Sequence, residues 1–492
     1  MKIPLFSLFA LLPGVLMAAP GFDERPYMVI PEPAVVNMSE GVCSNPVVLR
    51  TKKDASLGAE GYRLSITPKG VAVDAGDKAG LFYAQKTLEQ LKAQYKGGQI
   101  PCGVIEDKPR FGWRSMMLDT ARHFVPAADV KKFIDVMADY KFNKLHFHLT
   151  DDQGWRLPVP GYPKLKEVAS VREETFGNKT PHGGMYTKQE LKDLVKYAAE
   201  KNIEIIPEID LPGHNQALCT AYRDFQCFPD PNLKVRTDAG ISKTLVCPGN
   251  PDVYKFYDAV FKEVADIFPS KYVHLGGDEA PEDNWKKCPK CAAFREREGI
   301  RDADINKAAS KEMFAFFVKM SDLLKKKGKL PVFWYEPGGK YPDGSIATIW
   351  RNHNAKDVAN TSGTKVDVIY APNGVCYFDY PQLPGDWPTG QPDTGWMPLN
   401  TLENVYTLDP GRGLSPDELK RVRGIDCGMW SERMPDIKRM FYQAYPRCLA
   451  AIEAGWSPME VRGIDRFKTK VEFHKKLITE KWGIPMDRPE KK

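Results

Sequence analysis

Two adjacent carboxylates, Asp278 and Glu279, follow a short apolar run and two glycines in His274-Leu275-Gly276-Gly277-Asp278-Glu279. Neighbouring negative charges raise the pKa of one carboxyl group, so one member of the pair can hold a proton as a general acid while the other stays ionised. This division of roles suits cleavage of a glycosidic bond. The alternative is that the pair begins a helix, where acidic side chains interact favourably with the helix dipole.

Charged and aromatic residues also follow the other apolar runs of the chain. Arg122 follows the first run, Asp151 the second and His214 the third. The later runs end at, or are followed by, aromatic and acidic residues: Trp334, Trp350, Tyr377, Asp379, Trp430 and Glu432. Each tryptophan alone is typical of a protein core. As a set beside polar groups, they favour a carbohydrate pocket, where aromatic faces stack on a sugar and polar groups bind its hydroxyls.

Eight apolar runs of strand length must position these residues: Met116–Leu118, Leu145–Leu149, Ile203–Ile206, Tyr272–Leu275, Pro331–Trp334, Ile346–Trp350, Val366–Tyr370 and Gly428–Trp430. Several are separated by amphipathic helical stretches, at Ala128–Tyr140, Lys188–Lys201, Pro251–Phe268 and Asn306–Lys327. This rhythm predicts an α/β protein with a (β/α)8 barrel rather than a doubly wound sheet. Active sites of such barrels lie where the strands end. No glycine-rich nucleotide loop follows any run, and we expect no cofactor.

The position of the Asp-Glu pair predicts how the preceding strand ends. Adjacent residues of a regular strand point to opposite faces. If Asp278 and Glu279 lay on a regular strand, only one of them could face the barrel interior. We therefore expect the strand to end or bulge at Gly276-Gly277.

The rest of the 492 residues divides into two further segments. Residues 1–19 combine a positive start, a broken apolar run and Ala18-Ala19, which predicts a secretory signal peptide; the run is too short for a membrane anchor. We expect an exported protein, periplasmic or secreted, without a lipid anchor.

Residues 20–108 predict a small α+β domain, with strands at 61–67 and 70–75 and a helix over 77–95. Residues 109–492 then form the catalytic barrel and a C-terminal helical tail.

Composition excludes several classes of protein. With 42% hydrophobic and 27% charged residues, the chain is neither disordered nor collagen-like. A net charge of +6 over this length, without a Lys/Arg block, does not indicate a nucleic-acid partner. No later stretch is apolar enough to span a bilayer.

Ten cysteines in an exported chain favour disulfides. The candidate pairs are Cys43 with Cys102, Cys219 with Cys227, and Cys247 with either Cys288 or Cys291, although sequence alone does not determine connectivity. Cys288-Pro289-Lys290-Cys291 could also be half of a thiolate metal site with Cys247 as a third ligand. No second pair at zinc spacing occurs, so we predict no metal site.

Four motifs, in order, resemble those of glycoside hydrolase family 20, the β-N-acetylhexosaminidases. His274–Pro281 is similar to the family signature. Three further segments resemble its first three barrel strands: Arg114–Phe124, His146–Arg156 and Pro207–His214. Ala79–Leu88 resembles the last helix of the usual N-terminal domain.

The resemblance implies an exo-acting, retaining enzyme that removes terminal β-linked GlcNAc or GalNAc from oligosaccharides or glycoconjugates, with the substrate's 2-acetamido oxygen as nucleophile. Glu279 would be the general acid and base, and Asp278 would orient the acetamido group. Other residues would contact the sugar or tune the acid: Tyr377 at the acetamido carbonyl; Trp334, Trp350 and Trp430 around the acetyl group and ring; Arg122 at the C3 and C4 hydroxyls; Asp379 and Glu432 near C4 and C6; Asp151 and His214 behind the acid.

Two other functions stay open at this stage. His146 and His148 fall on one strand face, a spacing that metal-dependent amidohydrolases also use, with His214 and His274 as the only candidates for further histidine ligands. A barrel that binds sugar without cleaving it is the non-enzymatic alternative. The presence of both Asp278 and Glu279 argues against it.

Overall fold

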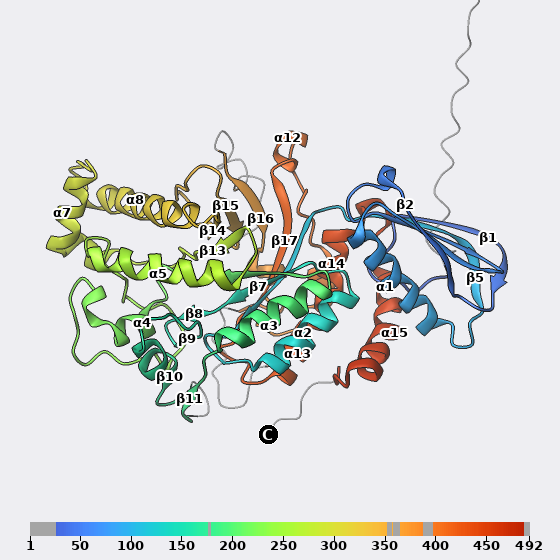
Figure 1. The fold of residues 1–492 in the computed structure, drawn as a ribbon, viewed down its shortest axis with the longest axis horizontal. Coiled ribbons are helices and arrows are strands. Elements are labelled where there is room, and N and C mark those ends of the chain that lie inside the picture. Colours follow the sequence, from blue (N-terminus) through green and yellow to red (C-terminus); the bar gives the residue numbers. More distant parts are fainter. Residues whose placement is uncertain (1–25, 176–178, 352–356, 358–364, 387–396, 487–492) are drawn as a thin grey trace, which may run out of the picture.

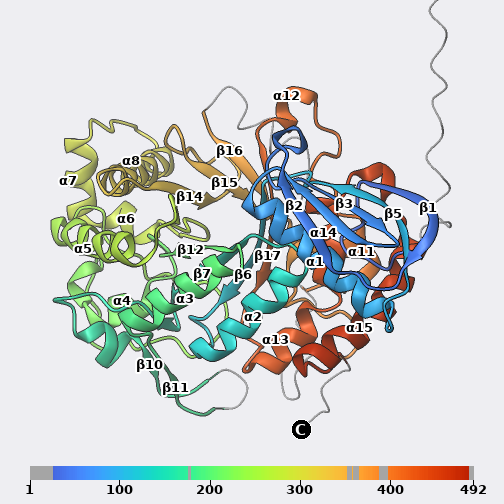
Figure 2. The ribbon, with the colours of Figure 1, turned by 45° about the vertical axis from the view of Figure 1, so that its right-hand side comes forward.

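The computed structural model describes residues 26–175, 179–351, 357, 365–386 and 397–486. Eight parallel strands close into a barrel with helices around it, which confirms the predicted fold class (Figures 1 and 2). In chain order the barrel strands are β6 (Trp113–Asp119), β7 (Lys144–His148), β12 (Glu204–Glu208), β13 (Tyr272–His274), β14 (Leu330–Trp334), β15 (Ile346–Ile349), β16 (Asp367–Tyr370) and β17 (Val422–Met429). The predicted signal peptide lies outside the described residues.

The four predicted helices form on the outside of the barrel: α2 (Ala127–Asp139), α3 (Lys188–Glu200), α5 (Pro251–Ile267) and α8 (Ile305–Lys325). Side-chain caps begin three of them, including α8, where Asp304 accepts a hydrogen bond from the Asn306 N–H. A capping box between Thr187 and Glu190 starts α3, and the Asn250 side chain caps α5, whose first residue is Pro251. The apolar faces of these helices pack on the strands in one continuous core.

The shorter elements connect the strands and helices. They are β8 (Thr150–Asp151), β9 (Gly154–Trp155), the π-helical turn Leu165–Ala169, β10 (Val171–Arg172), β11 (His182–Gly183), α4 (Gln216–Ala221), the 3-10 turn Arg223–Phe225, α6 (Asp283–Lys287), α7 (Pro289–Arg297), α10 (Asn373–Cys376), α11 (Leu402–Tyr406) and α12 (Pro416–Leu419). At the C-terminal side lie α13 (Ile437–Ala444), α14 (Arg447–Trp456), the 3-10 turn Met459–Val461 and α15 (Ile464–Trp482). Among the described residues, no helix is both long and apolar enough to cross a membrane.

A five-stranded sheet precedes the barrel, in the order β1-β5-β3-β4-β2, and α1 (Lys78–Gln94) packs on it (Figure 1). Its strands are β1 (Val35–Cys43), β2 (Val48–Lys53), β3 (Tyr62–Thr67), β4 (Gly70–Ala75) and β5 (Ile100–Asp107), and the 3-10 turn Ala55–Leu57 lies between β2 and β3. The predicted pair of strands forms the antiparallel hairpin β3-β4, in which Thr67 lies opposite Gly70.

The sheet attaches to the amino-terminal end of the barrel strands. Glu60 binds Arg114, at the start of β6, at 2.7 Å, and accepts a hydrogen bond from Asn143, just before β7, at 3.1 Å. A fully buried ion pair of 3.1 Å between Lys141 and Asp107 joins the same two regions. The carboxyl ends of the strands, where barrel enzymes place their chemistry, therefore face away from these contacts.

All ten cysteines are buried free thiols in the structure, which contradicts the expected disulfides. The Cys43–Cys102 and Cys219–Cys227 bonds are absent, and Cys247 is bonded to neither Cys288 nor Cys291. Cys227 instead lies with its sulfur 3.6 Å from that of Cys291.

Candidate active site

The turn that carries Asp278 and Glu279 leaves the barrel immediately after β13, as the sequence required. Gly276, Gly277 and Glu279 all have positive φ angles, of 64°, 98° and 46°. A side chain at Gly276 would collide with the carboxylate of Asp210, so only glycine allows this close approach. The strained φ of Glu279, in a non-glycine residue, is the kind of backbone conformation that clusters at functional sites.

The two neighbouring carboxylates lie in different environments. The Asp278 side chain is 11% exposed, whereas the Glu279 side chain is 25% exposed. Burial raises the pKa of Asp278 to about 7; the Glu279 charge acts in the same direction and His214 opposes it. Within the described part of the chain, Asp278 Oδ1 has no hydrogen-bond partner although it is buried. A buried acceptor without a partner is costly, which indicates a position shaped for a ligand donor.

His214 connects the carboxylate pair to the loop after β7. Its Nε2 lies 3.7 Å from Asp278 Oδ2 and 3.9 Å from Glu279 Oε2, and its Nδ1 lies 3.1 Å from Asp151 Oδ1. Burial opposes protonation of His214, but Asp151, Asp210 and Asp278 outweigh it and hold its pKa well above the usual value. A protonated imidazole therefore lies beside both carboxylates.

Arg122 forms a second charged group at the same end of the barrel. Its guanidinium lies 2.8 Å from Asp151 and 3.3 Å from Asp119, and its Nε donates to Gln153 at 3.2 Å. Burial opposes ionisation of Asp151, but Arg122 and His214 hold the pKa of this carboxyl below its usual range. Arg122 is consequently fixed in one orientation, with its charge retained.

Four aromatic side chains from four strand ends form a wall beside these groups. Trp350 and Tyr377 are parallel, with ring centres 6.3 Å apart. Trp430 lies 5.9 Å from Tyr377 and 5.8 Å from Trp334. Tyr377 pairs with Gly428 of β17, which brings the segment after β16 against the neighbouring strand. The structure therefore brings together the residues that the sequence predicted as an aromatic pocket.

Glu432 lies near Arg122, and Asp379 lies close enough to Glu432 for their charges to interact. Glu432 Oε1 is 3.8 Å from Arg122 Nη2. Burial, followed by the Glu432 charge, raises the pKa of Asp379 well above its usual value. Burial also raises the pKa of Glu432, although Arg122 opposes this effect. In the described residues, Asp379 Oδ1 is another buried oxygen without a hydrogen-bond partner.

Sequence reasoning did not identify the role of Glu208, the last residue of β12. It accepts a hydrogen bond from the Trp334 indole at 2.8 Å, contacts His274 and His146 at 3.0 Å each, and bonds His148. Burial opposes ionisation of Glu208, but the three histidines lower its pKa well below the usual value. Its position at a strand end was visible in the sequence, but the convergence of these histidines was not.

The two histidines that suggested a metal site are thus held by carboxylates. His146 Nδ1 also lies 2.6 Å from Asp426 of β17, and His148 Nε2 lies 2.8 Å from Asp151. His146, Glu208 and His274 do bring three possible ligand atoms within 4.8 Å of one another. All three contact the Trp334 indole: the ring centres of His146 and His274 lie 5.6 and 4.7 Å from it, and Glu208 accepts its N–H.

A cleft of about 810 Å³ borders Glu279. Its lining includes Glu279, Glu336, Phe317 and Tyr341, but not Asp278 or the aromatic wall. Glu279 is therefore the member of the pair that can be reached from outside the pocket.

The (β/α)8 barrel and the paired carboxylates at an aromatic pocket fit a glycoside hydrolase, and comparison with known proteins agrees. Residues 111–459 match the profile of the glycosyl hydrolase family 20 catalytic domain, and residues 32–108 match domain 2 of the same family. The chain belongs to glycosyl hydrolase family 20.

Relatives and solved structures extend this result. A beta-hexosaminidase of Akkermansia muciniphila is 48% identical over 484 residues, covering 97% of this chain and 96% of the relative. A beta-N-acetylhexosaminidase crystal structure, 48% identical, superposes with a TM-score of 0.89 over 94% of this chain and 97% of that chain. A mutant Streptomyces plicatus beta-hexosaminidase in complex with product GlcNAc is 28% identical, with a TM-score of 0.78 over 94% and 97% of the two chains.

Proposed function

We propose that the chain is an exo-acting, retaining β-N-acetylhexosaminidase that removes terminal non-reducing GlcNAc or GalNAc from oligosaccharides or glycoconjugates. One observation carries the proposal: Asp278 and Glu279 both lie within 3.9 Å of His214 Nε2, yet one is buried and the other is accessible. This arrangement separates an orienting carboxylate from a proton-transferring one. Family membership and the GlcNAc complex of the Streptomyces plicatus relative support the choice of sugar.

The reaction requires no protein nucleophile. The substrate's acetamido oxygen attacks C1, the glycosidic C–O bond breaks, and Glu279 gives its proton to the departing oxygen. Asp278 accepts a hydrogen bond from the acetamido N–H and stabilises the positive charge that develops on the oxazolinium ring. Glu279 then takes a proton from water as the water oxygen attacks C1, which reopens the ring and regenerates the acid with retained configuration.

The remaining residues hold the sugar in place for this reaction. Trp334, Trp350 and Trp430 enclose the acetyl group and the ring, and the Tyr377 hydroxyl donates to the acetamido carbonyl. Arg122 binds the C3 and C4 hydroxyls, with Asp379 and Glu432 on the C4 and C6 side. Asp151 and His214 lie behind the carboxylate pair and set its charge.

The three segments of the chain have separate roles in this proposal. Residues 1–19 act as an export signal, so the enzyme works in the periplasm or outside the cell. Residues 20–108 form an accessory domain and residues 109–492 the catalytic barrel with its tail. The contacts of Glu60 and Asp107 at the amino-terminal end of the barrel support an accessory role, because they lie away from the carboxylate pair.

Release of p-nitrophenol from its β-GlcNAc and β-GalNAc glycosides tests the activity. The matched control is p-nitrophenyl β-glucoside, which lacks the acetamido nucleophile and should not be cleaved. Brief exposure to EDTA should leave the rate unchanged. Loss of activity with the chelator in a chain that stays folded would favour the amidohydrolase alternative, and binding of GlcNAc without turnover would favour a sugar-binding barrel.

A further inference from the structure

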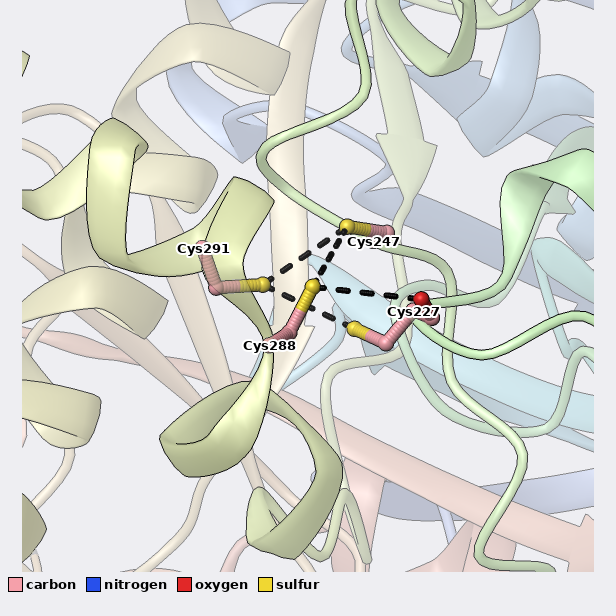
Figure 3. Close-up of side chains that lie close together, drawn as sticks. All are labelled: Cys227, Cys247, Cys288 and Cys291. Atoms are coloured by element: carbon pink, nitrogen blue, oxygen red, sulfur yellow. Dashed lines mark hydrogen bonds between the residues drawn. The ribbon is translucent and has the colours of Figure 1, made fainter.

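Four cysteines outside the active site converge in the loops at the carboxyl ends of β12 and β13. Cys227 and Cys247 come from the segment between β12 and α5, and Cys288 and Cys291 come from the start of α7 (Figure 3). The four sulfur atoms all lie within 4.8 Å of one another, and all four residues are buried. The sequence had suggested only the closely spaced pair and one possible third ligand.

The distances between the sulfurs match a tetrahedral metal site. Cys227 and Cys247 each lie 3.6 Å from Cys291, and Cys247 lies 3.8 Å from Cys288. Four thiolates at the Zn–S distance of about 2.3 Å form a tetrahedron with edges of about 3.8 Å. A disulfide needs sulfurs about 2.05 Å apart and joins them in pairs, whereas here Cys247 and Cys291 each have two close sulfur neighbours.

The surrounding backbone brings the two loops close enough for this cluster to form. Gly249 lies against the backbone of Lys290 and Cys291, where a side chain would collide. The Cys247 N–H donates to the Phe225 carbonyl at 2.7 Å, and Gln226 pairs with Val246 in an isolated bridge, so the two loop segments that carry Cys227 and Cys247 are joined. The Trp285 indole donates to the Val246 carbonyl at 3.1 Å and covers the cluster from the α6 side.

We propose that Cys227, Cys247, Cys288 and Cys291 bind one Zn²⁺ ion as a closed, four-thiolate structural site that ties together the two loops leading from the ends of β12 and β13. His214 lies on the first of these loops, and Asp278 and Glu279 lie on the second. Binding involves loss of the thiol protons to solvent and no redox step. Because all four positions around the ion are protein thiolates, the site offers no open position for catalysis. The proposal does not depend on the enzymatic activity.

Metal content of the full chain, purified without chelator or reductant, tests the site. We expect about one zinc per chain by elemental analysis, released when a mercurial titrates the thiols. The double variant C288S/C291S should contain close to no zinc and unfold at a temperature several degrees lower. Cys448→Ser is the matched control, because Cys448 is also a buried free thiol but lies on α14, outside the cluster; it should retain the zinc.

Two further measurements keep the proposal testable if the double variant does not fold. Replacement of zinc by Co²⁺ in the native chain should produce the intense visible bands of tetrahedral thiolate coordination. Alkylation after unfolding in EDTA without reductant should modify all four cysteines. Unreactive, disulfide-bonded cysteines in a chain without zinc would overturn the proposal, as would full zinc content in C288S/C291S.

Discussion

Asp151 Oδ1 lies 3.1 Å from His214 Nδ1, so the carboxylate holds the imidazole with its other nitrogen directed toward Asp278 and Glu279. Asp151 also binds Arg122 at 2.8 Å. One buried carboxylate therefore orients two cations of the pocket, the imidazolium behind the catalytic pair and the guanidinium assigned to the sugar hydroxyls. Because the cations hold Asp151 ionised, its charge in turn keeps His214 protonated.

The positive charge of His214 should determine the pH at which kcat/KM falls on the acidic side of its pH profile. Its positive charge lowers the pKa of Asp278, which must be ionised to orient the acetamido group. His214→Asn keeps a donor toward Asp151 but removes the charge, so the acidic limb of kcat/KM should move to higher pH, by about one pH unit. His182→Asn, which changes a histidine that bonds the Phe124 N–H, should leave the limb in place. A limb that stays fixed, or moves to lower pH, in His214→Asn would contradict this assignment.

Glu279→Gln should separate substrates by their leaving groups. Without a proton donor, kcat/KM for GlcNAc disaccharides should fall by about 10³-fold, while activated aryl glycosides should lose on the order of tenfold, since their leaving groups need little protonation. Steady-state rates with both substrates measure the difference. Glu282→Gln, a change in the adjoining cleft, serves as the control and should affect both substrates equally. Equal losses in Glu279→Gln would contradict the general-acid role.

Asp278→Asn should impair turnover severely, because it removes the charge that stabilises the oxazolinium ring. We expect kcat for p-nitrophenyl β-GlcNAc to fall by at least about 100-fold. The control is Asp283→Asn, at a side chain that is 64% exposed on α6, which should retain the wild-type rate. A rate for Asp278→Asn within tenfold of wild type would exclude the orienting role.

The same substitution should stabilise the fold in a pH-dependent way. Burial raises the pKa of Asp278 from 3.8 to about 7, so between these values the folded chain holds a proton that the unfolded chain has released. The contribution of Asp278 to stability therefore decreases as the pH rises through this window. Asp278→Asn should be more stable than wild type at pH 8, by on the order of 2 kcal/mol, and gain little at pH 4. Denaturant unfolding at both pH values measures this; an equal gain at pH 4 and pH 8 would contradict it.

A thiazoline analogue of the bicyclic intermediate should inhibit far more tightly than GlcNAc. Ligands that resemble the transition state bind at least about 10²-fold more tightly than substrates or products. Asp278→Asn should lose most of this advantage, because the ring nitrogen of the analogue then faces no carboxylate. Inhibition constants for both ligands and both proteins provide the comparison. Similar constants for thiazoline and GlcNAc in the wild-type enzyme would indicate another nucleophile.

The sequence by itself determined the barrel and most of the residues around its mouth. Short apolar runs and amphipathic stretches are local patterns that the sequence shows directly. In a parallel barrel, the carboxyl ends of all the strands lie at the same end of the barrel, so residues that follow the runs lie near one another. For this reason Asp278, His214, Arg122 and the tryptophans could be assigned to one site. The glycines before Asp278 also predicted correctly that β13 ends there. The start of β17 was not found, because Gly424 and Asp426 interrupt its apolar pattern.

Only the tertiary structure decided which distant residues become partners. Glu208 contacts histidines of β7 and β13. Asp426 of β17 contacts His146 of β7, which lies two strands away in the barrel but far away in the chain. The four cysteines of the proposed zinc site are a second set of partners that the sequence did not reveal. Cys227 and Cys247 lack the close spacing of a zinc motif, and chain folding, not spacing, brings them to Cys288 and Cys291. Periodicity reports which face of an element is buried, whereas the pairing of buried groups depends on how the elements pack.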